Sequence, residues 1–159
     1  MTEPTQHHSS SSIHCGRVIG LDYGDRRVGV ALSDENRVFS QALVTLSRTR
    51  RGDLEVVHQL LPILTLHEVT QIVIGWPLQL NGREGIQTRK VSQFVEVLNQ
   101  HTALPIVFWD ERLTTVAAER ALREGGVKAQ DQRKKIDQVA AALILQGWLD
   151  AQTSLSCNG

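Results

Sequence analysis

The sequence predicts an α/β domain with a mixed five-stranded sheet, three antiparallel strands followed by two parallel strands, flanked by helices. Two apolar runs rich in β-branched residues, 17–21 and 28–32, surround the turn signal Tyr23-Gly24-Asp25 and therefore indicate a β-hairpin. A third run at 37–45 follows after a short turn and extends the hairpin to an antiparallel meander. Farther along, short apolar runs alternate with helix-spaced apolar positions, which is typical of parallel strands covered by helices.

The elements after the meander are predicted from the spacing of apolar residues. Apolar positions three and four residues apart predict amphipathic helices, and short runs that are apolar throughout predict strands covered on both faces. A helix N-cap at Thr114 or Thr115 and the Gly125-Gly126 pair bound the third helix. In chain order the predicted elements are helix 53–66, strand 71–75, helix 85–101, strand 105–109, helix 114–124 and helix 136–151.

The chain of 159 residues is long enough for one domain, and its 41% hydrophobic and 21% charged residues are ordinary globular values. We expect a single domain at 16–152, a disordered Ser-rich extension at 1–15 and a loose tail at 153–159. Without an apolar run of 18 residues or a signal-peptide pattern, we expect a cytoplasmic protein with no membrane contact. The 17 basic and 17 acidic residues cancel, so the strongly basic character of many nucleic-acid-binding domains is absent, although charges can be segregated by face.

Three carboxylates occupy positions from which they can converge. Asp22 follows the first apolar run, Glu111 follows strand 105–109, and Asp137 lies at the start of the last helix beside its apolar stripe. Ligands of open α/β sheets bind beyond the carboxyl ends of the strands. Each residue also has a structural interpretation: Asp22 starts a turn, Glu111 caps the third helix and Asp137 compensates the helix dipole. One shared site accounts for all three positions at once, so we predict a catalytic and metal-binding triad.

Converging carboxylates repel one another unless a cation neutralises them. Oxygen ligands without Cys or an obligatory His suit Mg²⁺ or Mn²⁺. Such a site most naturally serves phosphodiester hydrolysis, in which two metal ions about 4 Å apart activate water and stabilise the leaving oxygen. Gly20, Gly24 and Gly29 leave space in the hairpin for the close approach of a phosphate or of another backbone.

Other side chains are candidates for contacts with substrate phosphates. The Gly-rich stretch 75–85 follows a strand and opens a helix, as phosphate cradles do, although it lacks the Gly-Lys-Ser/Thr ending of a Walker A loop. A guanidinium and two hydroxyls follow Glu111 and suit phosphate contacts. Local basic clusters supply further candidates, although any single cluster is better explained as solvated surface. The predicted substrate-binding residues are Arg27, Gly75, Pro77, Gly82, Arg83, Arg112, Thr114, Thr115, Lys134 and Lys135.

Five stretches of the chain, in order, resemble one bacterial family. They are 21–34 (LDYGDRRVGVALSD), 75–77 (GWP), 82–85 (GREG), 110–115 (DERLTT) and 134–142 (KKIDQVAAA). They are similar to the pre-16S rRNA nuclease family, also described as Holliday-junction-resolvase-like. The resemblance implies a ribonuclease-H-like fold, a cytoplasmic location and maturation of the 5′ end of 16S ribosomal RNA, with Asp22, Glu111 and Asp137 as the acidic triad. Trp76 departs from the family's usual Leu, and the fourth carboxylate of true resolvases has no counterpart, since Asp131 lies on another helical face than Asp137.

Three other functions stay open at this point. A Holliday-junction resolvase would share the chemistry but make two coordinated cuts, so a stable homodimer rather than a monomer would favour it. A kinase of the actin and sugar-kinase type needs a second domain, for which the chain has no room. A non-catalytic RNA-binding factor of ribosome assembly is the third, although few aromatic residues argue against single-strand stacking. The expected partner is structured RNA, namely pre-16S rRNA in a ribosome precursor, or branched DNA.

Overall fold

The structure, a computed structural model, describes residues 16–113 and 129–156, of which 113 and 129–136 are described by their backbone alone. No helix within these ranges is both long and apolar enough to span a membrane. The elements in chain order are β1 (Arg17–Tyr23), β2 (Arg27–Ser33), β3 (Ser40–Ser47), α1 (Asp53–Leu66), β4 (Val69–Trp76), α2 (Ile86–Asn99), β5 (Ile106–Asp110), the 3-10 turn η1 (Glu111–Leu113) and α4 (Ala129–Ser156).

One mixed sheet holds the five strands in the order β3-β2-β1-β4-β5. β1 is antiparallel to β2, and β2 is antiparallel to β3. β4 runs parallel to β1, and β5 runs parallel to β4. The predicted sheet of three antiparallel strands followed by two parallel strands is therefore confirmed. Because β1, β4 and β5 are parallel, their carboxyl ends meet at one edge of the sheet.

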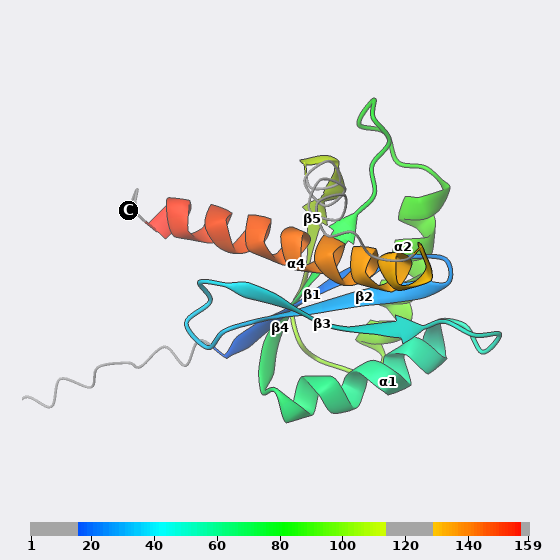
Figure 1. Ribbon diagram of the computed structural model, residues 1–159, viewed down its shortest axis with the longest axis horizontal. Helices are drawn as coiled ribbons and strands as arrows, with labels where there is room; N and C mark the ends of the chain where they lie inside the picture. The colour runs from blue at the N-terminus through cyan, green and yellow to red at the C-terminus, as the bar shows by residue number, and fades with distance from the viewer. Residues whose placement is uncertain (1–15, 114–128, 157–159) are drawn as a thin grey trace, which may run out of the picture.

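Helices cover both faces of the sheet (Figure 1). On one face, alternate strand residues such as Ile19 pack with residues of α1 and α2 such as Phe94 in the larger core. α4 crosses the opposite face, where Val18 and Leu145 belong to a second, smaller core. Successive residues of a strand point to opposite faces. The place of a residue in this alternation therefore decides which layer its side chain enters.

Glycines allow α4 to lie close against the sheet. Gly20 and Gly29 belong to the face that α4 covers. A Cβ atom at Gly20 would come within 2.7 Å of the Leu145 Cβ, and a Cβ atom at Gly29 would overlap the backbone carbonyl of Asp137. The space that these two hairpin glycines leave is therefore filled by another backbone, that of α4.

α1 has the predicted bounds, and most other elements differ from the predicted ones by one or two residues. β3 differs more, because it begins at Ser40 rather than at Arg37. The Asp34 carboxylate accepts hydrogen bonds from the backbone amides of Val38 and Phe39, and Arg37 has a φ of 58°. These residues are therefore held in a turn and cannot join the strand.

α4 extends beyond the predicted helix 136–151 at both ends. It begins at Ala129, so Asp137 lies more than two turns from the helix start, which removes dipole compensation as an explanation of this carboxylate. It also continues to Ser156, although a loose tail was expected from residue 153. Hydroxyls near this end, such as that of Thr153, donate to carbonyls four residues earlier and are satisfied within the helix. The predicted helix 114–124 and extension 1–15 lie outside the described residues.

Replacing Gly29 by alanine is expected to lower the free energy of unfolding by about 3 kcal/mol, because the added methyl group would overlap the backbone of α4. Urea denaturation followed by circular dichroism measures the change. As a control, Ala42→Val enlarges an exposed residue of β3 and should alter the free energy of unfolding by less than about 0.5 kcal/mol. Wild-type stability of the Gly29→Ala variant would mean that α4 does not press on the sheet there.

Candidate active site

The three predicted triad residues come from three separate elements on the α4 side of the sheet. In β1, Asp22 lies on the same face of the sheet as Val18 and Gly20, because successive strand residues alternate between the two faces. It is paired with Gly29 in β2. Glu111 follows β5 directly and begins η1. Asp137 lies on α4, whose backbone at this residue touches Gly29. Gly29 therefore adjoins two members of the triad. Asp22 is also separate from the hairpin turn, so the interpretation of this residue as a turn-starter is wrong.

Asp22 and Glu111 are joined by a hydrogen bond between their carboxyl groups. Gly75 of the intervening strand β4 makes room for this pair, since a Cβ atom there would overlap the Glu111 carboxyl group. Burial and the charge of Asp137 raise the pKa of Asp22 to about 6. Burial and the charge of Asp22 raise the pKa of Glu111 to about 8. The two carboxyl groups therefore share a proton at neutral pH.

Asp137 has a different partner, because the Arg27 Nε donates a hydrogen bond of 2.9 Å to its Oδ2. Burial raises the pKa of Asp137, and the hydrogen bond from Arg27 acts in the opposite direction. Arg27 was predicted to bind substrate, and the structure places it on a carboxylate of the triad. Sequence reasoning missed this ion pair, because 110 positions separate its members. One shared proton and one guanidinium thus offset two of the three negative charges of the acids and leave one uncompensated.

The donor set of this site fits a hard divalent cation. It consists of carboxylate oxygens, and burial together with the charges of neighbouring acids raises the pKa values of Asp22 and Glu111. Within the described residues, no three His, Cys, Asp or Glu side chains already form a metal cluster. Two of the acids bind each other and Asp137 binds Arg27, so a cation would take the place of the shared proton.

The stretch between β4 and α2 adjoins η1. Its turn is closed by hydrogen bonds from the Gly82 amide to the Gln79 carbonyl, at 2.8 Å, and from the Gln79 amide to the Arg83 carbonyl, at 2.9 Å. Gly82 has a φ of 80°, which glycine adopts without strain. A Cβ atom at Gly82 would lie 3.3 Å from Nη1 of Arg112. Two of the predicted phosphate-binding residues, Gly82 and Arg112, are therefore neighbours.

Of the other predicted substrate-binding residues, some lie within the described part of the chain and some lie outside it. Arg112 donates several hydrogen bonds to the Asp110 carboxylate, among them one of 2.9 Å from Nε and one of 2.6 Å from Nη2. Arg83 is exposed. Gly75 lies under Glu111, and Pro77 directly follows β4. Residues 114 and 115 lie outside the described part of the chain, as do the side chains of 134 and 135.

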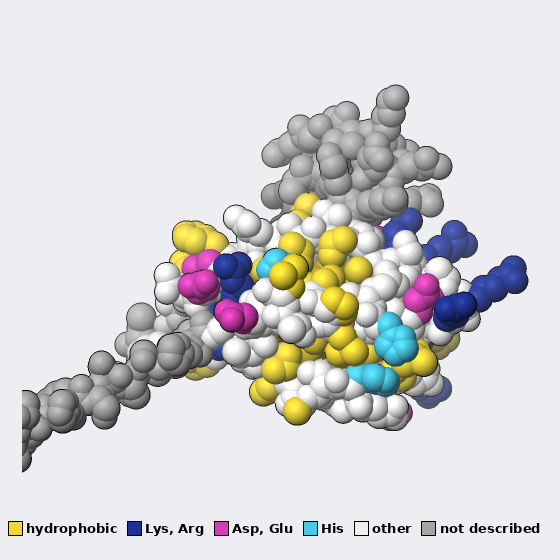
Figure 2. Space-filling model, turned by 90° about the horizontal axis from the view of Figure 1, so that it is seen from below, with side chains coloured by type: hydrophobic (Ala, Val, Ile, Leu, Met, Phe, Trp, Pro, Cys, Tyr) yellow, Lys and Arg dark blue, Asp and Glu magenta, His cyan; other side chains and the backbone are white. Residues whose placement is uncertain are grey.

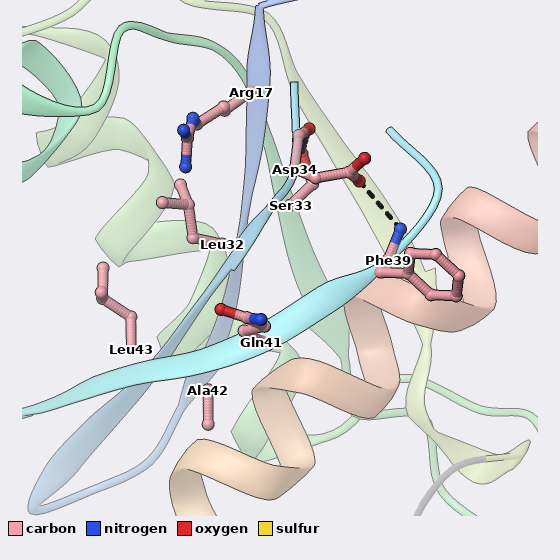
Figure 3. Close-up of a pocket in the computed structure, with 8 residues that line it drawn as sticks. All are labelled: Arg17, Leu32, Ser33, Asp34, Phe39, Gln41, Ala42 and Leu43. Carbon is pink, nitrogen blue, oxygen red and sulfur yellow. Dashed lines mark hydrogen bonds between the residues drawn. The ribbon is translucent and has the colours of Figure 1, made fainter. Parts of the chain in front are cut away.

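A pocket of about 230 Å³ lies at the other end of β2 (Figure 3). It is lined by Arg17, Leu32, Ser33, Asp34, Phe39, Gln41, Ala42 and Leu43. Figure 3 shows the Asp34 carboxylate turned toward the Phe39 amide, from which it accepts a hydrogen bond of 2.9 Å. This bond closes the turn between β2 and β3. The pocket contains no residue of the triad and does not extend the carboxylate site.

Replacing Glu111 by glutamine is expected to stabilise the metal-free protein at high pH. The pKa of Glu111 is near 4.5 in the unfolded chain and about 8 in the folded protein, so the folded state binds more protons between these values. Folding stability therefore falls as the pH rises from about 4.5 to about 8. The variant lacks this loss and should exceed the wild type by about 1–3 kcal/mol at pH 9, with no gain below pH 4. Denaturation in chelator across this pH range measures the difference.

The control for this measurement is Asp110→Asn, the neighbouring residue in the chain. The hydrogen bonds and charge of Arg112 lower the pKa of the Asp110 carboxylate. Its contribution to folding stability therefore rises with pH, opposite to that of Glu111. Neutralising Asp110 should give no stabilisation at pH 9. An equal gain in both variants would mean that general charge repulsion, rather than the pair of Asp22 and Glu111, destabilises the protein at high pH.

Two solved structures of junction resolvases share the fold of this chain. The structure titled "T. thermophilus RuvC in complex with Holliday junction substrate" is 15% identical, with a TM-score of 0.56 over 87% of this chain and 96% of the other. A Fowlpox virus resolvase complexed with substrate Holliday junction DNA is 7% identical, with a TM-score of 0.52 over 86% and 98% of the two chains. The expected ribonuclease-H-like fold is thereby confirmed.

The sequence itself matches a family and its curated members. A protein of Syntrophus aciditrophicus named "Putative pre-16S rRNA nuclease" is 45% identical over 85% of this chain and 89% of its own length. A protein of the same name from a Roseiflexus species is 44% identical over 86% and 96% of the two chains. The family model described as "RuvX: Holliday junction resolvase" matches residues 16–151. The chain belongs to this RuvX family of nucleases.

Proposed function

We propose that this chain is a divalent-metal-dependent nuclease that processes the 5′ end of pre-16S rRNA in the cytoplasm. The observation that carries the proposal is the contact between the Asp22 and Glu111 carboxyl groups, with Asp137 brought to the same face by α4 at Gly29, the partner of Asp22 in β2. Two half-buried acids with raised pKa values at one end of the sheet are costly to the fold unless they bind a cation. The name shared by the relatives at 44–45% identity supports ribosomal RNA as the substrate.

Within this proposal, Asp22 at the end of β1, Glu111 after β5 and Asp137 on α4 would hold the cation. Mg²⁺ or Mn²⁺ bound there supplies Lewis acidity toward the phosphate and lowers the pKa of water. Arg27 keeps the Asp137 carboxylate oriented through the 2.9 Å bond to Oδ2, and this carboxylate would supply an oxygen ligand to the cation. Gly75 keeps the position of the Glu111 carboxyl group open. We also propose that Gly82, Arg83 and Arg112 contact the phosphates that flank the scissile bond.

Holliday-junction resolution is a second candidate, which the description of the matching family favours. The same three acids would carry it out, because the reaction is again phosphodiester hydrolysis. The two candidates differ in substrate and in assembly, since a junction calls for two coordinated cuts and therefore for a two-fold dimer.

Neutralising the triad one residue at a time, with Asp22→Asn, Glu111→Gln and Asp137→Asn, should reduce cleavage at least about 100-fold, because each change removes a cation ligand. Cleavage of a pre-16S rRNA fragment and of a four-way DNA junction is measured side by side in Mg²⁺, in Mn²⁺ and in chelator. Cutting of the RNA alone supports the first candidate, and symmetric nicks in the junction support the second.

The matched control for the triad is Asp150→Asn, which neutralises an exposed carboxylate near the other end of α4 and should leave cleavage unchanged. A readout independent of activity is the rise in melting temperature with Mn²⁺, expected in the wild type and lost in Asp22→Asn. Full cleavage by all three triad variants, with an undiminished Mn²⁺ effect, would refute the proposed site.

A further inference from the structure

Three exposed arginines lie at the end of the sheet where β1 and β3 end and β2 begins. The triad lies near the same end. Arg26 is in the turn between β1 and β2, and Arg50 and Arg51 are in the loop between β3 and α1. The two segments are neighbours, since the Arg48 amide donates a hydrogen bond of 2.9 Å to the Arg26 carbonyl. Figure 2 shows Lys and Arg side chains gathered at the right-hand end of the molecule, where Figure 1 places both segments. We call Arg26, Arg50 and Arg51 the arginine edge.

The guanidinium groups of the arginine edge have no ion-pair partner within the described part of the chain. Nearby acids are already engaged: Asp25 binds Lys90 at 2.7 Å, and Asp53 binds Arg48 at 3.1 Å. Exposed positive charges gathered on neighbouring segments create a local positive potential. Three of them together on a chain of zero net charge indicate a surface that receives an anion from outside.

Backbone hydrogen bonds fix the positions of these arginines. The Gly52 amide donates to the Thr49 carbonyl at 3.0 Å, so Arg50 and Arg51 are the central residues of a tight turn. The Gly24 amide donates to the Arg27 carbonyl at 2.9 Å and closes the turn that contains Arg26. The arginine edge therefore consists of two adjacent turn tips rather than of one long mobile loop.

The arginine edge is also anchored to the strand that carries Asp22. The Tyr23 hydroxyl donates a hydrogen bond of 2.6 Å to Asp53 at the start of α1. The Arg48 guanidinium binds the same carboxylate and lies 5.4 Å from the centre of the Tyr23 ring. Four residues of chain join Asp22 to Arg26 and span at most about 14 Å. A nucleic-acid strand cut at Asp22 therefore reaches the arginine edge with its neighbouring nucleotides.

We propose that the arginine edge binds the phosphate backbone of structured RNA on one side of the cleavage site. The proposal rests on the nuclease function proposed above and adds a surface outside the triad. Guanidinium groups match phosphate oxygens with two parallel hydrogen bonds. The described exposed aromatic residues, Phe39 and Phe108, lie elsewhere, so base stacking is not the mode of binding at this edge. Contacts to the backbone fix the register of the substrate and do not read its sequence.

The test compares RNA binding by two full-length proteins that both carry Asp22→Asn, which prevents cleavage during the measurement. One has the natural arginine edge, and the other also carries Arg26→Gln, Arg50→Gln and Arg51→Gln. The probe is a fluorescein-labelled transcript of the 16S rRNA 5′ precursor, followed by anisotropy at several salt concentrations. The loss of three phosphate contacts should raise Kd at least about tenfold and reduce the slope of log K against log salt by about 2–3.

Two matched variants show whether the effect belongs to these positions. Gln41→Glu, Gln100→Glu and Gln152→Glu together change the net charge by the same amount at exposed positions away from this edge, and should preserve the salt slope. A triple Arg→Lys variant of the arginine edge keeps its charge and should retain most of the slope. Equal losses in the glutamine-to-glutamate control would overturn the proposal, as would unchanged binding by the arginine-to-glutamine variant, which would point to an acidic protein partner.

Cleavage separates this inference from the proposed function. With Asp22 intact, the arginine-to-glutamine variant should show a higher KM for the RNA and an unchanged single-turnover rate at saturating RNA. If the wild type cuts no RNA, the proposed function is wrong. The binding comparison then still tests whether the arginine edge binds RNA. If the wild type cuts and both the binding and the KM of the variant are normal, the inference alone is wrong.

Discussion

The site depends on the close contact between the backbone of α4 and the glycines of the sheet. Gly20 and Gly29 let the helix approach until its backbone touches β1 and β2, and this contact decides where Asp137 can stand. Gly75 serves the same face differently, since it leaves space for the Glu111 carboxyl group over β4. Each glycine in a strand costs about 0.5–1 kcal/mol of conformational entropy. The apolar contacts that α4 makes with the sheet offset this cost and hold the triad together.

The electrostatics of the site follow from that packing. Three acids are brought to one face, where Asp22 and Glu111 share a proton and the guanidinium of Arg27 binds Asp137. Burial penalises the ionised forms, so the pKa values of both members of the pair rise. The repulsion between these carboxyl groups destabilises the fold locally, and a cation bound there would remove this destabilisation. Such a conflict between stability and function is common in active sites.

Residue patterns predicted the sheet because each strand carries its own local signal, either β-branched pairs around a glycine turn or a run that is apolar throughout. They also predicted that Asp22 and Glu111 approach one another, since the ends of parallel strands meet whatever the details of packing. The patterns failed where a distant partner decides the outcome. The start of β3 is set by the Asp34 carboxylate, and the Arg27–Asp137 pair joins two segments 110 positions apart. Local periodicity contains no information about either contact.

The zero net charge of the chain conceals a separation of charges that a nuclease needs. An acidic triad repels a polyanion, so a substrate can approach it only if positive charge lies close by. The hairpin of β1 and β2 meets both demands within a few residues, because Asp22 in β1 lies on the face that α4 covers and Arg26 lies exposed in the turn beyond it. The anchoring of the next loop by Tyr23 and Asp53 fixes Arg50 and Arg51 beside Arg26. The hairpin that carries the first acid of the triad therefore also positions the charge that would draw RNA toward it.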